Sequence, residues 1–448
     1  MKIRLSPKCE SSTLLSYLCL EDLSTRVPWE NKRLYASSVL EEGVHVSLIG
    51  RLPMNGPDVP LAASLAKGKP RVLFVVTEDW YFKLHWIGLA QAARDAGFEV
   101  LLAMHVQEHG SEITRQGFKL FPINLIRRSV NPIREFLSVV ELGRLYRAEK
   151  PDLVYHIAIK PILYGSIAAR FAGSPIVVNV FAGLGYTYSS EEFKARCFRQ
   201  ILKFGLKAAC RSANTMAVFQ NEEDQAQLVR DHVVLQGQTR VIRGTGVDTD
   251  RFRPSPDQGH EPPIILLPCR MLWDKGVGEF VEAARLVRQV NPSARFVLVG
   301  RCDEDNPASI QSDQLHRWQE EGVIEWWGHR SDMPAVFQSA AVVVLPSYRE
   351  GLPVSLLEAS ACGKPIIATD VPGCRDVVRH RENGLLVPPR NARALADAMT
   401  VLLDNPELRH AMGERGRAFV VKEFSATMVT RQTLALYDEL LHTAAQDS

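Results

Sequence analysis

Two glutamates eight positions apart are the first residues whose types and spacing suggest chemistry. Glu350 and Glu358 stand in the segment SYREGLPVSLLEASACGKP, where Gly351 and Pro353 separate the first acid from a helical pattern. Proline suits the first turn of a helix, so free N–H groups near Pro353 would point toward the loop of Glu350 and attract a phosphate. The carboxylates could then accept hydrogen bonds from a sugar and a ribose at opposite ends of one diphosphate. Two surface glutamates in contact with solvent are the alternative.

A second segment, PCRMLWDKG, carries two cations. Arg270 offers a planar fork of donors to phosphate oxygens, Lys275 offers a point charge, and Gly276 opens the next helical pattern. Two cations beside a helix start can neutralise a leaving diphosphate, so we expect no metal and no other cofactor. The alternative is a pair of ordinary surface cations.

The elements that must position these residues follow a repeating pattern. From Arg71 onward, fully apolar strands alternate with helical patterns, which is typical of a parallel sheet covered on both faces. The alternation stops at 251–263, a linker rich in proline, glycine and charge, and then restarts. We therefore predict an α/β protein with two doubly wound, Rossmann-like domains, 71–250 and 264–424, that face a cleft. Ligands bind beyond the carboxyl ends of the strands in such sheets.

Bulk composition narrows the class of protein. A formal charge of +2 over 448 residues argues against a nucleic-acid partner. Eight scattered cysteines without a C-x-x-C pair favour free thiols in a reducing compartment, and we expect a cytoplasmic protein. Residues 1–70 do not fit the alternating plan. We interpret them as an N-terminal extension, either poorly ordered or the remnant of a duplicated βα unit.

Three motifs together resemble those of the retaining GT-B glycosyltransferases of family 4. They are R-x-x-x-x-K-G from Arg270, G-V-D-x-x-R-F from Gly246 and E-G-L-P-x-x-x-x-E-A from Glu350. The resemblance runs from about Arg71 to the end of the chain. It implies that Arg270 and Lys275 hold the diphosphate of a nucleotide-sugar donor and that Glu350 contacts the donor sugar. We expect UDP as the nucleotide.

The resemblance also implies the rest of the donor site. Glu358 would bind the ribose, and the loop at Gly328 and His329 would line the nucleobase pocket through backbone groups. Gly351, Leu352 and Pro353 would complete the donor loop. Enzymes of this family retain the anomeric configuration. The acceptor proton passes to the leaving phosphate, so that no side chain is an obligatory base.

The first domain resembles bacterial members that add a hexose or N-acetylhexosamine to polyprenyl-diphosphate-linked saccharides of surface polysaccharides. The resemblance rests on YHIAIKPILYGSIAARFAG and VNVFAGLGYTYSS. His156, Lys160, Gly183 and Gly185 are the acceptor-side candidates. A core histidine and a surface lysine remain equally open for the first two. Relatives carry His-Gly where this chain has Ala182-Gly183, which leaves the donor sugar open.

A membrane-facing helix is a further expectation. Between 119 and 211 the chain has fifteen Lys or Arg and six Asp or Glu, and SSEEFKARCFRQILKFGLKAACR reads as a basic amphipathic helix. Its expected apolar stripe includes Ile201 and Leu202, with Lys203 and Lys207 beside it. Such a helix can lie on an anionic membrane surface, here the cytoplasmic face of the inner membrane. An ordinary helix that packs its stripe inward is the alternative.

Three rival functions stay open. A sugar-nucleotide epimerase of the same architecture would need acid and base groups and no acceptor pocket, a scaffold would keep the fold without activity, and a transferase could use a soluble acceptor. We expect the last helix, about 425–448, to pack back across the seam, and the seam at 250–263 to act as a hinge that closes on the donor.

Overall fold

The computed structural model describes residues 68–126, 131–173, 176–183, 193–255, 262–303, 306 and 308–446. Pro60–Ser448 form one compact unit. The interpretation of the N-terminal extension falls almost wholly on residues outside the described ranges, and so does the acceptor-side candidate Gly185.

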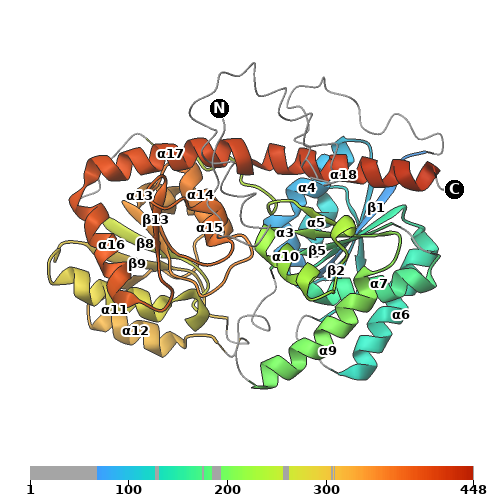
Figure 1. Ribbon diagram of the computed structural model, residues 1–448, viewed down its shortest axis with the longest axis horizontal. Coiled ribbons are helices and arrows are strands. Elements are labelled where there is room, and N and C mark those ends of the chain that lie inside the picture. The colour runs from blue at the N-terminus through green and yellow to red at the C-terminus, as the bar shows by residue number, and fades with distance from the viewer. Residues whose placement is uncertain are drawn as a thin grey trace, which may run out of the picture. The chain divides into compact units, whose positions relative to one another are not determined.

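Seven strands form the first sheet in the order β3-β2-β1-β4-β5-β6-β7, and each neighbouring pair is parallel (Figure 1). The strands are β1 (Arg71–Glu78), β2 (Glu99–His105), β3 (Lys119–Pro122), β4 (Leu153–Ile157), β5 (Ile176–Phe181), β6 (Thr215–Phe219) and β7 (Thr239–Val241). The helices between them are α3 (Asp79–His85), α4 (Ile87–Asp95), α5 (Gly110–Arg115), α6 (Pro132–Glu149), α7 (Ile159–Phe171), α9 (Phe193–Cys210) and α10 (Glu222–Arg230). A short 3-10 turn, η3 (Gln236–Gln238), precedes β7.

Six parallel strands form the second sheet in the order β10-β9-β8-β11-β12-β13. The strands are β8 (Ile264–Pro268), β9 (Arg295–Val299), β10 (Glu325–Trp326), β11 (Val342–Leu345), β12 (Ile366–Thr369) and β13 (Gly384–Val387). The helices are η4 (Trp273–Lys275), α11 (Val277–Arg288), α12 (Ser312–Glu320), α13 (Met333–Ser339), α14 (Val354–Ala361), α15 (Cys374–Val377), α16 (Ala392–Asp404), α17 (Pro406–Phe424) and α18 (Ala426–Gln446). The predicted α/β class with two doubly wound sheets is confirmed.

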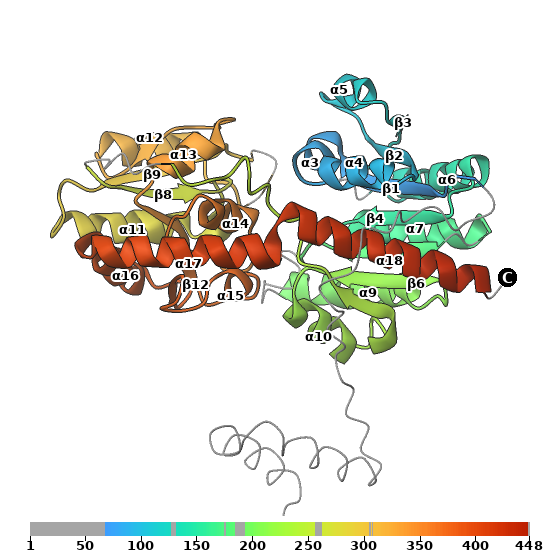
Figure 2. The same cartoon turned by 90° about the horizontal axis from the view of Figure 1, so that it is seen from above.

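The last two helices belong to different cores. α17 packs against α14 of the second sheet, whereas α18 packs against α4 and β5 of the first, and Figure 2 shows the two helices along the two halves. Val429, Leu436 and Tyr437 of α18 are buried in the first core, where the Tyr437 ring lies 5.5 Å from the ring of Tyr155. The end of the chain therefore completes the core that its beginning builds.

The chain passes between the sheets at two neighbouring places. The N–H of Val247 donates to the carbonyl of Phe424 at 2.9 Å, and the N–H of Ala426 donates to the carbonyl of Val247 at 2.9 Å. Gly246 precedes this pairing with a φ of +73°, and a Cβ atom there would lie 2.6 Å from the Cα of Ala426. Only glycine satisfies both the left-handed backbone and the close approach.

Strand order reverses once in each sheet, between β1 and β4 and between β8 and β11. In open parallel sheets, the loops that leave two such strands diverge and open a ligand site at the carboxyl ends. In the second sheet these loops are 269–276 and 346–353. They carry three of the residues that the sequence selected, Arg270, Lys275 and Glu350.

Candidate active site

Lys275 and Glu350 form the centre of the site. The Lys275 Nζ lies 2.6 Å from the Glu350 Oε1, and Ser347 donates its hydroxyl to the same oxygen at 2.6 Å. The two charged side chains are only 18% and 11% exposed. Burial lowers the pKa of Lys275, but the charge and the hydrogen bond of Glu350 outweigh burial, so the pKa is raised above its usual value. Lys275 therefore stays charged at neutral pH.

The backbone brings these two loops together at Gly276. This residue lies between η4 and α11 with a φ of +72°, and a Cβ atom there would lie 2.1 Å from the carbonyl oxygen of Pro346. A side chain at 276 would push the loop after β8 away from the loop after β11. Gly276 thus sets the spacing between Lys275 and Glu350.

Arg270 follows β8, as predicted, but it is paired with an acid that sequence reasoning missed. Its Nη1 donates to the Oδ2 of Asp303 at 2.9 Å, and its side chain is 40% exposed. Asp303 follows β9, the neighbour of β8 on the other side from β11. Thirty-three positions separate the two residues, so only the strand order could have paired them.

Glu358 lies in the second turn of α14, which begins at Val354 with Pro353 as its N-cap. Its half-buried carboxylate has no hydrogen-bond or ion-pair partner among the described residues. Burial raises the pKa of Glu358 to about 7, and the nearby charge of Arg251 lowers it less. A carboxylate held in this way is a good acceptor for hydroxyl donors.

The donor loop meets the first sheet at two glycines. A Cβ atom on Gly351 would lie 2.9 Å from the Cα of Gly183, which follows β5 with a φ of +104°. Leu352 is buried, and its Cδ2 would lie 2.8 Å from a Cβ atom on Gly244. Gly183, a predicted acceptor-side residue, is thus brought into contact with the predicted donor loop.

The first sheet also sends polar side chains to this loop. The Nδ2 of Asn221 donates to the carbonyl of Gly351 at 2.8 Å, and Arg349 is bonded to the carboxylate of Asp224. Asn221 and Asp224 are each 1% exposed. Neither residue could be selected from the sequence, because 130 and 125 positions separate them from their partners.

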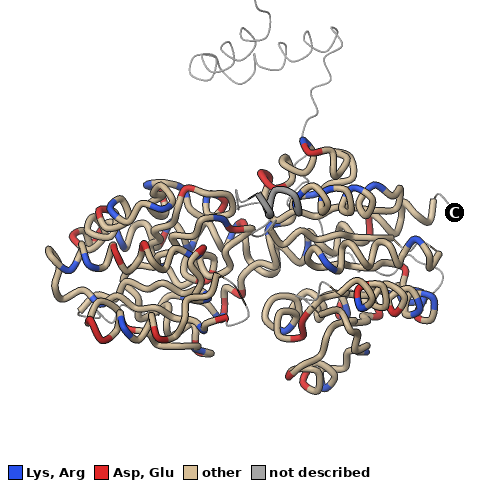
Figure 3. Tube along the Cα trace, turned by 90° about the horizontal axis from the view of Figure 1, so that it is seen from below, with Lys and Arg blue, Asp and Glu red and all other residues tan. Residues whose placement is uncertain are grey.

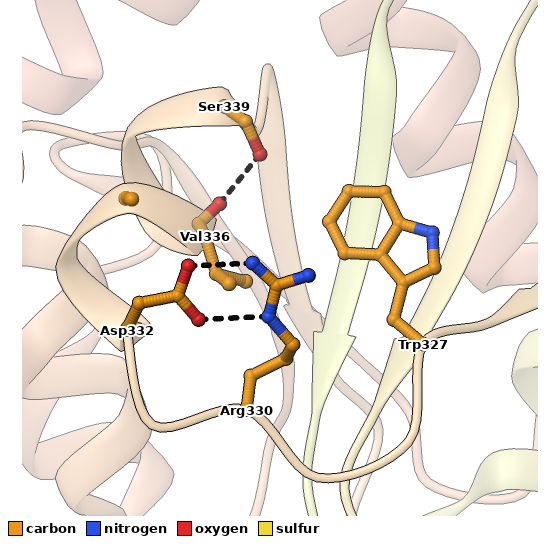
Figure 4. A pocket seen from close by; sticks show the side chains of 6 residues that line it. Trp327, Arg330, Asp332, Val336 and Ser339 are labelled. Carbon is orange, nitrogen blue, oxygen red and sulfur yellow. Dashed lines mark hydrogen bonds and ion pairs between the residues drawn. The ribbon is translucent and has the colours of Figure 1, made fainter.

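The predicted nucleobase loop follows β10. Gly328 has a φ of +66°, its carbonyl accepts from the N–H of Gly300 at 2.8 Å, and His329 is exposed. Beside this loop is a hollow of about 450 Å³, shown in Figure 4. It is lined by Trp327, Arg330, Asp332, Ala335, Val336 and Ser339. The Arg330 guanidinium makes two hydrogen bonds to Asp332, at 2.7 and 2.5 Å.

The prediction that His156 faces an acceptor is wrong. His156 lies inside β4 and is fully buried, with its Nε2 2.9 Å from the Tyr146 hydroxyl and its Nδ1 2.8 Å from the Oδ1 of Asn179. Burial lowers its pKa to about 4, so the ring is neutral. Its ring fills the space beside Gly165, where a Cβ atom would lie 2.3 Å from the Nε2. The core histidine is the correct alternative.

Lys160 is already paired within the first domain. It lies in the first turn of α7, where its Nζ donates to the carbonyl of Ile126 at 2.7 Å and to the Oε1 of Glu135 at 3.0 Å. Its side chain is only 18% exposed, so it is neither an open surface lysine nor a free phosphate ligand. It ties α7 to the start of α6.

The corresponding loop of the first sheet begins at the end of β1. Asp79 is fully buried and accepts hydrogen bonds from the N–H groups of 107, 108 and 109, and its Oδ1 accepts from the N–H of Trp80. Burial raises the pKa of Asp79, but these donors outweigh it, and the pKa is lowered. The guanidinium of Arg301, which follows β9, lies 5.7 Å from the Trp80 ring. None of these residues was selected from the sequence.

Chemically, the second sheet offers two cations and one carboxylate in the loops after the adjacent strands β8 and β11, and a second carboxylate in the second turn of α14. Phosphate oxygens suit the cations, and hydroxyl groups suit the carboxylates. The arrangement fits a molecule with a diphosphate between two hydroxyl-bearing groups.

Comparison with known proteins agrees with this chemistry. Residues 248–419 match the family Glycosyl transferases group 1, and residues 71–216 match the family Glycosyl transferase 4-like. The fold, the site and these two matches define the chain as a glycosyltransferase of the two-sheet GT-B type. More particularly, the second half matches the group 1 glycosyltransferases and the first half matches the 4-like family.

Two curated bacterial relatives cover nearly the whole described chain. One is the N,N'-diacetylbacillosaminyl-diphospho-undecaprenol alpha-1,3-N-acetylgalactosaminyltransferase of Campylobacter jejuni, 28% identical over 79% of this chain and 94% of the relative. The other is the UDP-Gal:alpha-D-GlcNAc-diphosphoundecaprenol alpha-1,3-galactosyltransferase of Escherichia coli, 26% identical over 72% of this chain and 84% of the relative.

A solved structure supports the fold. The crystal structure of Anabaena Alr3699/HepE in complex with UDP and glucose superposes with a TM-score of 0.65 and 19% identity, over 82% of this chain and 98% of that one.

Proposed function

We propose that the protein transfers a hexose or an N-acetylhexosamine from a nucleotide-diphosphate sugar, with UDP as the nucleotide, to a polyprenyl-diphosphate-linked saccharide in bacterial surface polysaccharide synthesis. The observation that supports this proposal is the pairing of Lys275 with Glu350 at 2.6 Å, on the loops that leave the adjacent strands β8 and β11. Arg270 lies on the same loop as Lys275. The names of the two relatives supply the acceptor class, and one of them names a UDP-sugar donor.

The proposed reaction retains the anomeric configuration. The bond between the anomeric carbon and the diphosphate oxygen breaks, a bond from the acceptor oxygen forms on the same face, and the acceptor proton passes to the leaving phosphate. Lys275 and Arg270 stabilise the charge that develops on the diphosphate, a role for which a preorganised and partly buried cation is well suited. The reaction then requires neither a metal ion nor a protein base.

Glu350 has two tasks in this mechanism. Its Oε1 fixes the Lys275 ammonium at 2.6 Å, and its other oxygen remains available for a hydroxyl of the donor sugar. Glu358, in the second turn of α14, takes the ribose hydroxyls. Both carboxylates hold the donor in the orientation that the reaction needs, which lowers the entropic part of the activation barrier.

We also propose that α6, α7 and α9 form the surface that contacts an anionic membrane. Seven of the 13 exposed large apolar side chains of the described chain lie on these three helices. They are Ile133, Phe136, Leu137, Ile167, Phe171, Ile201 and Phe204. α7 packs against both α6 and α9, and Figure 1 shows the three helices together. A lipid-linked acceptor would be presented at such a surface.

The structure changes the sequence-based interpretation of α9. Leu202 and Leu206 point into the first core, whereas Ile201 and Phe204 are 72% and 79% exposed. Lys203 is paired with Asp231 at 2.9 Å, and Lys207 is exposed. Figure 3 shows basic and acidic positions interspersed along the trace, so the apolar side chains distinguish this surface more than its charge does. Among the described residues, no helix is long and apolar enough to span a bilayer.

A donor panel tests the proposed reaction. The purified chain is incubated with UDP-linked glucose, galactose and their N-acetylamino analogues, with and without a synthetic polyprenyl-diphosphate disaccharide, and products are read by mass spectrometry. We expect one donor to extend the lipid-linked acceptor. An isomerised donor without acceptor would favour an epimerase, and extension of free saccharides alone would favour a soluble acceptor.

Glu350→Gln tests the site within the same assay. The amide keeps the size of the side chain but loses the charge that holds Lys275, so transfer should fall about 10²–10³-fold. Glu282→Gln is the matched control, because Glu282 makes an exposed ion pair with Arg285 on α11. Equal transfer by the wild type and Glu350→Gln would contradict the assignment.

A further inference from the structure

The N-terminus of α10, a helix of the first sheet, contacts the donor loop of the second sheet. Asn221 caps this helix, since its Oδ1 accepts from the N–H of Asp224 at 2.7 Å. The Nδ2 of Asn221 also donates to the carboxylate of Asp224 at 3.2 Å. The cap and the first acid of the helix therefore form one rigid, buried group.

This group contacts the donor loop on both sides of Glu350. Arg349, the residue before Glu350, is bonded to Asp224. Gly351, the residue after Glu350, accepts from the Nδ2 of Asn221 at 2.8 Å through its carbonyl. Within the second sheet, Lys275 fixes the Glu350 carboxylate itself.

We propose that Asn221 and Asp224 are positioning residues for glycosyl transfer, which act by anchoring the backbone of the Glu350 loop from the opposite sheet. They do not contact the donor. They determine where the Glu350 backbone lies relative to Lys275 and to the loop after β5. The inference deepens the proposed transfer reaction and rests on the role of Glu350 in it.

Burial supports a specific anchor over a general attraction between the sheets. Asp224 is 1% exposed and Arg349 is 23% exposed on the side chain, so water competes little for their bond. The neighbouring pair of Glu223 and Arg375 also joins the two sheets, at 2.7 Å, but its side chains are 50% and 43% exposed. Exposed pairs of this kind contribute little.

The backbone at Gly351 is closely packed on two sides. Gly351 and Gly183 touch through their backbones, so no side chain fits between them. Gly373 closes the other side, because a Cβ atom there would lie 2.5 Å from the carbonyl oxygen of Gly351. Loss of the anchor would therefore loosen the backbone of Arg349 and Gly351, on either side of Glu350.

Two variants separate anchoring from folding. Asp224→Asn keeps the size of the side chain but removes its charge, and its amide group opposes that of Asn221. Asn221→Ser keeps a capping oxygen for α10, while its side chain is too short to reach the carbonyl of Gly351. Glu223→Gln is the matched control on the same helix tip.

Hydrogen exchange of the ligand-free full chain measures the anchor directly. We expect Asp224→Asn and Asn221→Ser to speed amide exchange in residues 348–352 about tenfold and to leave β12 unchanged. Turnover at saturating substrates should fall about tenfold, with the acceptor KM, the affinity for UDP and the thermal midpoint near those of the wild type. Glu223→Gln should change each quantity less than twofold.

Unchanged exchange at 348–352, or an equal change in Glu223→Gln, would overturn the proposal. Faster exchange with unchanged turnover would also overturn it, because the contacts would then be merely structural. If the wild type transfers no sugar at all, the proposed reaction fails. Hydrogen exchange then still decides whether the loop is anchored. The affinity for UDP-sugars decides whether the anchor matters for the donor.

Discussion

Glu358 combines a proposed role in donor binding with a cost in stability. Its half-buried carboxylate has no hydrogen-bond or ion-pair partner among the described residues, and burial raises its pKa from 4.5 to about 7. The folded state therefore keeps the proton to higher pH than the unfolded state does. The stability of the wild type should fall as pH rises from about 4.5 to 7, because a buried charge then replaces a neutral acid.

Glu358→Gln removes this ionisation. At pH 8 the variant should be more stable than the wild type by about 1–3 kcal/mol, and the difference should shrink toward pH 4.5. Donor affinity should fall, since an amide offers one acceptor oxygen in place of two. Urea unfolding at pH 5 and pH 8 and calorimetry with UDP measure both effects. If the difference in stability between the variant and the wild type were the same at pH 5 and pH 8, burial of the Glu358 carboxylate would carry no cost.

The residues of the proposed donor site could be selected from the sequence because each motif is local. Lys275 and Glu350 each follow an apolar strand, and the resemblance supplied their roles. The partners of Arg270, Gly351 and Arg349 could not be predicted. Asp303, Asn221 and Asp224 reach these residues only through strand order and the meeting of the two sheets.

At the scale of elements, hydrophobic periodicity predicted the strands and most helices. It did not predict whether a side chain near the end of a strand faces a ligand or the core. His156 stands one residue before the end of β4, and its polar type suggested an open position. In the structure its ring instead joins Tyr146 of α6 to Asn179 of β5. A buried polar network of this kind leaves no signal in a single strand.

The exposed face of α9 makes a prediction at the same scale. Phe204→Ser should weaken binding to phosphatidylglycerol-containing vesicles about tenfold, because a phenyl ring loses its burial in the lipid interface. Vesicle flotation measures the bound fraction, and neutral vesicles should bind the wild type less. Val290→Ser is the control, since Val290 is 65% exposed in the turn after the unrelated helix α11. Equal loss of vesicle binding in both variants, or no loss in Phe204→Ser, would contradict the proposal that α9 contacts the membrane.

At the scale of the whole molecule, the two sheets are joined where Val247 pairs with the corner between α17 and α18. Arg417 of α17 strengthens this junction, since its guanidinium donates to the carbonyls of Phe252 and Ala361, each at 2.6 Å. Residues 247–252 are therefore tied to the second core, although composition alone suggested a linker only from 251. The donor loop and its anchor depend on this junction, because Glu350 and Asn221 belong to different sheets.

Gly246→Ala should disturb the junction selectively. The added Cβ would meet the backbone of Ala426 at 2.6 Å, which cannot move aside as a flexible side chain could, and the left-handed φ of +73° adds about 1–2 kcal/mol. Gly117→Ala carries the same backbone penalty at a φ of +86°, but only the mobile end of Arg94 lies near, at 3.8 Å. We expect scanning calorimetry to show one transition for Gly117→Ala and two for Gly246→Ala, with transfer reduced only in the latter. Identical thermograms would mean that the halves are coupled elsewhere, through α10 and the donor loop.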